Sequence, residues 1–209
     1  PRLKNAFGSW QKKLRGKAWN MLYLENHDHP RIISRYGSEK FWKQSGKMLA
    51  VSYLFQKGTP FVYQGEELGM TNFDFESMAD IQDVESKNMV PTLKKLGLND
   101  RRIFERMKKA SRDNARTPMQ WTAGENAGFT TGTPWINVNP NYTFINAKQQ
   151  MSDPDSVFSF YKKLISLRKA HPVIVEGDFT LLMKEDKQVF AYTRSYEGKT
   201  LLVACNFSG

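Results

Sequence analysis

Cysteine is almost absent from the chain: Cys205 is the only one among 209 residues. A single cysteine excludes a disulfide framework within the chain. Its apolar neighbours, in "LLVACNF", predict a buried thiol rather than a reactive one. Sparse cysteine is typical of proteins from a reducing compartment, so the sequence predicts a cytoplasmic location.

Long apolar runs are also lacking. No stretch reaches the roughly 18 apolar residues of a membrane-spanning helix, so we expect no membrane partner. The first ten residues contain neither an initiator methionine nor the apolar core of a signal peptide. We interpret the chain as part of a longer protein.

Acidic residues are too few to balance the basic ones, and the formal net charge is +10. Lysine and arginine concentrate in 11–17 and in 94–116. The second stretch also carries Asp100, Glu105 and Asp113, which favours a solvated helix face over a phosphate-binding surface. We therefore expect no nucleic-acid partner. Nucleic-acid binding stays an alternative for the basic helix near 101–112 alone.

Apolar periodicity predicts helices and short strands in alternation, which is typical of parallel strands joined by helical crossovers. Gly16, Ser38 and Asp153 stand where helix caps are expected. The predicted helices are 3–15, 38–57, one or two within 76–110, and 154–169; the predicted strands are 18–24, buried on both faces, and 60–63.

The pattern changes after the last of these helices. "DFTLLMK", "QVFAYTRS" and "TLLVACNF" read as consecutive strands, with "SYEGK" as a hairpin turn. Strands without crossover helices predict an antiparallel sheet, so we place a domain boundary between 1–172 and 173–209. Within the first domain, 70–150 is a long insertion rich in Asn, Pro and Gly, and 126–142 reads as an ordered loop.

Polar clusters follow both predicted parallel strands: "ENHD" after 18–24 and "QGEE" after 60–63. The carboxyl ends of parallel barrel strands form the ligand-binding rim, so these clusters predict a carbohydrate or phosphate site. Glu25 and Asn26 fit either a structural or a functional role. Glu66 and Glu67 read as scaffolding of the rim rather than as catalytic groups.

Five stretches resemble one known family. "YLENHDHPRIISRYG", "GTPFVYQGEELGMTN", "SRDNARTPMQW", "NAGFTTGTPW" and "VNPNY" are similar to the α-glucosidase branch of the α-amylase superfamily, and most of all to oligo-1,6-glucosidases and dextran glucosidases. The resemblance covers essentially the whole chain. It implies an α/β fold: the C-terminal portion of a (β/α)8 TIM barrel, from its sixth to its eighth helix, followed by the start of an all-β antiparallel domain.

The resemblance also implies roles for four residues. Asp28, in "NHD", corresponds to the acidic residue that stabilises the transition state of a retaining glycosidase, and His27 to a histidine that contacts the same sugar. Arg112 corresponds to the arginine at the non-reducing end of the bound glucose, which gives exo-action. Glu85, in "DVES", corresponds to a glutamate of the aglycone subsite. Arg116 reads as an internal scaffold.

The family's other two catalytic carboxylates, a nucleophile aspartate and an acid–base glutamate, lie upstream of the matched stretches. We therefore expect the isolated chain to be inactive and the full-length protein to hydrolyse α-1,6 and possibly α-1,4 bonds of short oligosaccharides. We expect no cofactor and no metal ligands here; calcium enters only through the missing N-terminal part. A small oligosaccharide is the expected substrate. We expect the full-length protein to be a monomer.

Two alternatives share most of these motifs. One is a sucrose isomerase or a trehalose-forming relative, and the other is a glucosidase-like binding subunit without catalysis. Retention of "NHD" and Arg112 favours an enzyme, because a binding protein has no need for a transition-state carboxylate.

Overall fold

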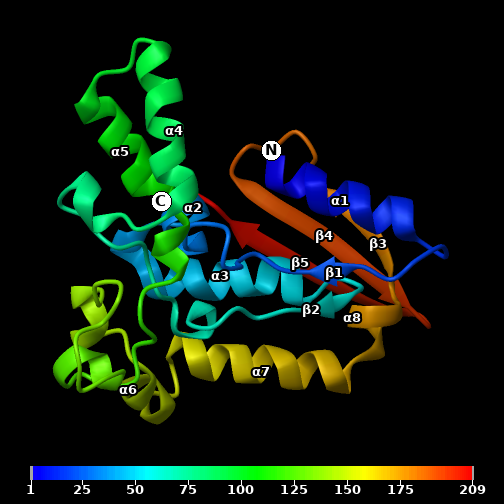
Figure 1. The fold of residues 1–209 in the computed structure, drawn as a ribbon. Helices are drawn as coiled ribbons and strands as arrows, with labels where there is room; N and C mark the ends of the chain where they lie inside the picture. The colour runs from blue at the N-terminus through cyan, green and yellow to red at the C-terminus, as the bar shows by residue number, and fades with distance from the viewer. Residues whose placement is uncertain (1, 209) are drawn as a thin grey trace.

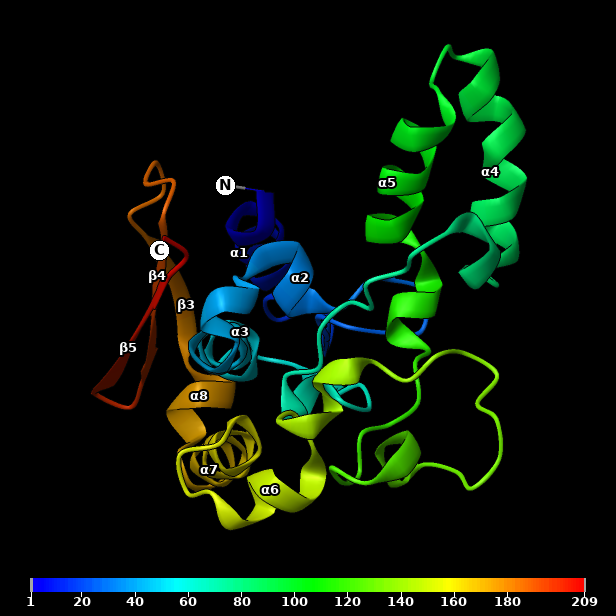
Figure 2. The same cartoon turned by 90° about the vertical axis from the view of Figure 1, so that its left-hand side faces the viewer.

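The computed structural model describes residues 2–208, in which helices pack against one side of a parallel strand pair and against a separate antiparallel sheet (Figures 1 and 2). The elements follow the predicted alternation, but the short helices α2, α6 and α8 were not anticipated, and the two parallel strands are shorter than the predicted 18–24 and 60–63. The helices are α1 (Arg2–Leu14), α2 (Ile32–Tyr36), α3 (Trp42–Leu54), α4 (Val84–Lys95), α5 (Asp100–Ala110), α6 (Ala147–Ser152), α7 (Val157–Ala170) and α8 (Pro172–Glu176). None of these helices is long and apolar enough to cross a membrane.

The parallel pair consists of β1 (Met21–Leu22) and β2 (Thr59–Pro60), in the register Met21 to Thr59. Gly58 precedes β2 with a φ of 141°, and a Cβ there would lie 2.5 Å from the Asn20 carbonyl oxygen. Only glycine therefore permits this close approach of the two strands.

Burial on both faces of 18–24 was predicted, and this is wrong for the chain as described. Leu22 and Leu24 are buried, whereas Trp19, Met21 and Tyr23 on the other face are exposed. The reason is that helices cover only one face of the two strands. Because side chains alternate along a strand, those on the covered face are buried and those on the other face are exposed.

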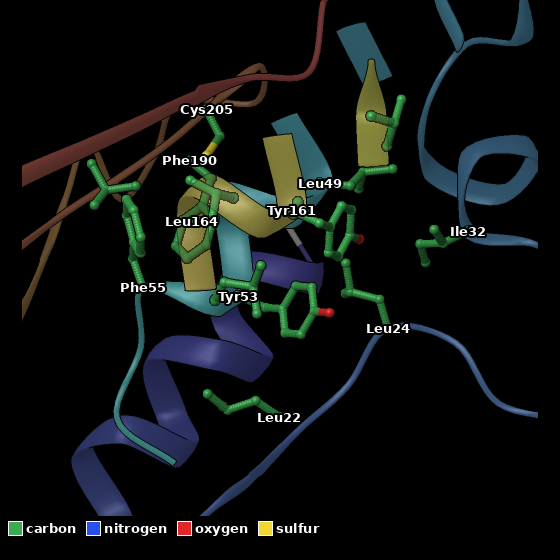
Figure 3. Packing of buried hydrophobic residues seen from close by; sticks show 14 of the residues in the cluster. Leu22, Leu24, Ile32, Leu49, Tyr53, Phe55, Tyr161, Leu164, Phe190 and Cys205 are labelled. Carbon is green, nitrogen blue, oxygen red and sulfur yellow. The ribbon is translucent and has the colours of Figure 1, made fainter. Parts of the chain in front are cut away.

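The antiparallel sheet has the order β3 (Asp178–Leu182), β4 (Val189–Tyr196), β5 (Lys199–Asn206), as predicted. Glu197 and Gly198 form the predicted hairpin turn, both with positive φ. The sheet packs on α3, and its apolar side joins the main core (Figure 3). Cys205 is buried in this core, as predicted, and burial raises the pKa of its thiol to about 12.

Two predicted helix caps are wrong. Ser38 makes no capping bond, because a 3-10 turn (Glu39–Phe41) comes first and the Ser45 hydroxyl accepts the Ser38 amide. The last long helix begins at Val157, where the Ser156 side chain accepts the Ser159 amide. Asp153 instead accepts the Asp155 amide and pairs with Lys43 on α3.

Two long cationic side chains connect the helices to neighbouring segments. The buried Lys4 ammonium of α1 donates to the carbonyls of Met183 and Asp186 in the β3–β4 connection and of Val189 at the start of β4. Arg168 of α7 donates to the carbonyls of Leu54, Gln56 and Gly58, at the end of α3 and the entry to β2. These bonds fix the antiparallel sheet and the second parallel strand against the helices.

Helices α4 and α5 form a hairpin that projects from the body of the molecule (Figure 2). The hairpin has an apolar cluster of its own, separate from the main core. The buried members of this cluster are Phe75, Ile81, Leu93, Ile103 and Met107. Its base, at 82–85 and 111–113, meets the polar residues that follow β1.

Candidate active site

The loop that follows β1 places Asp28 and His27 at the carboxyl end of the strand. The Asp28 amide donates to the Asn26 side chain at 2.8 Å, a local turn that directs the Asp28 carboxylate outward. His27 Nε2 lies 3.2 Å from Asp28 Oδ2, and both side chains are about half or more exposed. The two residues that the resemblance singled out in "NHD" therefore present one open polar surface.

Two arginines from the segment after α5 reach the same carboxylate. Arg112 Nη1 lies 3.5 Å and Arg116 Nη2 3.2 Å from Asp28 Oδ1. Arg116 Nε also donates to the His27 carbonyl at 3.0 Å. Arg116 was expected to be an internal scaffold; instead it contacts both candidate residues of the rim. Both guanidinium groups are therefore placed beside the Asp28 carboxylate.

Glu85 joins the cluster through Arg112. Its carboxylate, at the start of α4, lies 3.5 Å from Arg112 Nη1 and is largely exposed. Asp28, His27, Arg112 and Glu85, taken from three distant parts of the sequence, thus lie in one network. Their roles toward a sugar stay predictions.

Asp83, next to this network, holds Arg112 most tightly. Its Oδ1 accepts Arg112 Nε at 2.8 Å and Nη2 at 2.5 Å. Burial opposes ionisation of Asp83, but the bonds from Arg112 and Ser86 outweigh it and lower its pKa to about 2. The same contact raises the pKa of Arg112. This ion pair is therefore charged at neutral pH.

A buried ion pair lies beneath the rim. Glu25 Oε2 accepts Arg31 Nη1 at 3.0 Å and Oε1 accepts the Ile32 amide at 2.7 Å. Arg31 also donates to the Gln64 carbonyl, just after β2, at 2.8 Å. Each side chain is 1% exposed. This pair joins the ends of β1 and β2, so Glu25 has a structural role, one of the two left open by the sequence.

Glu66 is a second buried carboxyl, close to Glu25. Its Oε1 accepts the Tyr161 hydroxyl at 2.9 Å and its Oε2 the Tyr63 amide at 3.3 Å. Burial, followed by repulsion from Glu25, raises its pKa to about 8. At neutral pH Glu66 is therefore protonated, and Arg31 balances the charge of Glu25 alone. Glu67 bonds the Gly65 amide at 2.8 Å, which agrees with the scaffolding role predicted for both glutamates.

The proton on Glu66 has a consequence for stability. A carboxyl whose pKa is 4.5 unfolded and about 8 folded binds more protons in the native state between these values. The free energy of unfolding therefore falls as pH rises from about 4.5 to about 8, by up to ~1.4 kcal/mol per pH unit from this group. We expect Glu66→Gln to flatten the dependence, as measured by denaturant unfolding at several pH values.

Glu105→Gln, an exposed site on α5, is the control for that experiment and should keep the slope of the wild type. An equal slope in Glu66→Gln and wild type would mean that Glu66 is ionised in the native protein.

No group of three His, Cys, Asp or Glu side chains is placed to hold a metal ion within residues 2–208. The carboxylates of the rim are occupied by arginines and backbone amides instead. What these residues can do chemically is accept hydrogen bonds from, and place charge beside, a polar neutral molecule.

Sequence reasoning missed Asp83 and misjudged Arg116. The first had a signal: "DVES" reads as an aspartate helix cap, and such an aspartate is well placed to bind a nearby arginine. The role of Arg116 had no signal in the sequence, because Arg116 and Asp28 are 88 positions apart.

Parallel strands with polar carboxyl ends, crossover helices and a following antiparallel sheet define a piece of a TIM-barrel enzyme with a C-terminal β domain. The chain belongs to the alpha-amylase catalytic-domain family, whose model matches residues 1–177. It forms the C-terminal portion of that barrel and the start of the β domain after it.

Individual relatives cover the chain almost completely. An oligo-1,6-glucosidase from Parageobacillus thermoglucosidasius is 50% identical over 99% of the chain and 37% of its own length. The crystal structure of the Bacillus licheniformis trehalose-6-phosphate hydrolase is 49% identical, with a TM-score of 0.94 over 99% of this chain and 38% of that one. The trehalulose synthase MutB from Pseudomonas mesoacidophila MX-45 is 42% identical, with a TM-score of 0.93 over 98% and 37%. The chain thus spans little more than a third of the length of the relatives it matches.

Proposed function

We propose that the protein to which this chain belongs is a retaining, exo-acting α-glucosidase of short oligosaccharides with α-1,6 bonds, with α-1,4 bonds as the secondary linkage. The observation that carries the proposal is the carboxylate of Asp28, exposed at a strand end and surrounded by His27, Arg112 and Arg116. The similarity to an oligo-1,6-glucosidase over the whole chain supports the linkage.

In this proposal Asp28 accepts hydrogen bonds from two adjacent hydroxyls of the glucose that is cleaved. Bonds to a carboxylate are stronger than neutral ones, and they lower the barrier if they tighten as the ring flattens toward an oxocarbenium ion. His27 contacts the same sugar. Arg112 limits the site at the non-reducing end, and Glu85 faces the aglycone.

The proposal extends to the organisation of the chain. Residues 1–172 form the barrel part and 173–209 the β domain, which the change from a parallel pair to an antiparallel sheet supports. In this proposal the nucleophile and the acid–base carboxylate come from the part of the protein upstream of this chain. The full-length protein is a cytoplasmic monomer that uses no cofactor.

The direct test is product analysis with the full-length protein. We expect glucose from isomaltose, with less from maltose, and none of either from the 209-residue chain alone, since it lacks the nucleophile and the acid–base group. Glucose release by the chain alone would overturn the assignment of those two groups to the upstream part.

Two further substrates separate the alternatives. Conversion of sucrose to an isomer without net hydrolysis would favour an isomerase, an alternative supported by the similarity to a trehalulose synthase. Cleavage of trehalose 6-phosphate in preference to isomaltose would favour a hydrolase of phosphorylated disaccharides, supported in the same way. Binding of isomaltose without turnover of any substrate would indicate a non-catalytic subunit.

A further inference from the structure

We propose that Asp83 is a positioning residue of the sugar site: it fixes the Arg112 guanidinium so that one nitrogen remains directed at the rim. The proposal rests on the proposed function, because it assigns Asp83 a part in the same site. It starts from the fact that Asp83 is buried, whereas every residue to which the sequence gave a sugar contact has an exposed side chain or a partly exposed one.

The carboxylate of Asp83 is saturated with hydrogen bonds. Its Oδ1 accepts Arg112 Nε, Arg112 Nη2 and the Glu85 amide. Its Oδ2 accepts the Ser86 hydroxyl at 2.7 Å, the Ser86 amide and the Arg112 amide. Both oxygens thus cap α4, and both also bond Arg112. The position of the guanidinium is therefore set by the start of a helix rather than by a flexible loop.

Asp113 makes the reciprocal connection. Its Oδ2 accepts the amides of Gln82 and Asp83 at 2.6 and 2.8 Å, and its side chain is fully buried. Arg112 and Asp113, which are neighbours in one segment, therefore bond Gln82 and Asp83, which are neighbours just before α4. Rotation or sliding of the Arg112 backbone relative to Asp83 would break both connections at once.

The geometry divides the guanidinium into two parts. Nε and Nη2 are taken by Asp83, and Nη1 is left 3.5 Å from Asp28 and 3.5 Å from Glu85. These two distances are long for a charge-assisted bond. Asp83 thus restrains Arg112 from closing fully onto Asp28. The Asp28 carboxylate, which also lies beside Arg116 and His27, keeps its exposed side open to sugar hydroxyls. Without Asp83 the flexible arginine would pair with Asp28 and compete with the substrate.

The test is a double-mutant cycle in the full-length protein, with isomaltose as substrate. Asp83→Asn removes the charge but keeps a good helix cap. We expect it to lower kcat/KM about 100-fold, mostly through KM, because misplacement of about 1 Å at a site has effects of this size. In an Arg112→Ala background the same change should have almost no further effect on kcat/KM, since the group that Asp83 positions is then absent.

Asp83→Ser is the second variant, because serine also caps a helix and cannot hold a guanidinium by charge. Asp80→Asn is the matched control. Asp80 lies in the 3-10 turn Met78–Asp80 of the same segment, where it accepts the amide of the N-cap Ser77 rather than Arg112. Both Asp83 variants should lose activity in parallel, and Asp80→Asn should keep the KM of the wild type. Melting temperatures of all variants show whether each is folded.

The outcomes separate the two proposals. Additive effects of Asp83→Asn and Arg112→Ala on kcat/KM, or coupling that is seen in melting temperature alone, would overturn the positioning role and leave the proposed function standing. A wild-type protein that releases no glucose from isomaltose or maltose would overturn the proposed function, and the positioning role with it.

Discussion

Asp28→Asn in the full-length protein should lower kcat on isomaltose by about 10³-fold or more, with little change in melting temperature. The amide keeps the size of the carboxylate but loses the charge that strengthens hydrogen bonds to the ring hydroxyls. If those bonds tighten in the transition state, their loss appears in kcat more than in KM. The fold should tolerate the change because Asp28 is about half exposed, and its arginine partners reach solvent.

The measurement is steady-state kinetics on isomaltose and on maltose, with Asp100→Asn as the control. Asp100 is an exposed aspartate at the start of α5 that pairs with Lys94, away from the rim, so its loss should leave both constants unchanged. A near-wild-type rate for Asp28→Asn would remove Asp28 from the mechanism, whatever its place in the structure.

Arg31→Met should cause the largest loss of stability, about 3–5 kcal/mol, because it leaves Glu25 buried without a partner. For a chain of this size the melting temperature should fall by about 10 °C or more. Burial already raises the pKa of Glu25 in spite of Arg31. Without the arginine Glu25 takes up a proton more readily, so the loss should be smaller at acid pH and larger above neutral pH.

A second substitution tests the cause. In Arg31→Met with Glu25→Gln the unpaired charge is gone, while an oxygen remains to accept the Ile32 amide. Thermal unfolding should show that the double variant regains part of the lost stability at pH 8. If it is no more stable than Arg31→Met, the loss comes from packing around Arg31 and from its bond to the Gln64 carbonyl, not from the charge of Glu25.

Local patterns predicted the elements of this fold well where periodicity was strong. Helix α1 and the antiparallel strands follow from spacing and turn residues. The parallel pair was placed in the right part of the chain, but its strands are limited to 21–22 and 59–60 instead of 18–24 and 60–63. The caps at Ser38 and Asp153 failed because several polar residues precede each helix, and tertiary contacts decide which of them begins it. The helix after Asp153 begins at Val157 because Ser156 takes the cap and Asp153 is drawn to Lys43.

The candidate site also has a part that local sequence predicted and a part that only tertiary packing determines. Asp28 and His27 follow a strand directly, so their place at its carboxyl end could be predicted from the order of elements. The contact of Arg116 with Asp28, and the burial of Asp83, depend on how a hairpin far along the chain folds back onto that loop. No short-range pattern contains this information, since it arises only when the separate segments pack.

The hairpin of α4 and α5 gives the site a modular character. Its apolar cluster is separate from the main core, and substitutions in clusters that share no contacts have additive effects on stability. Side chains on the hairpin can therefore vary without a penalty to the barrel core, while Asp83 and Asp113 keep its base in register with the rim. If the proposed function holds, selection can reshape the side of the site assigned to the leaving group and preserve the Asp28 carboxylate.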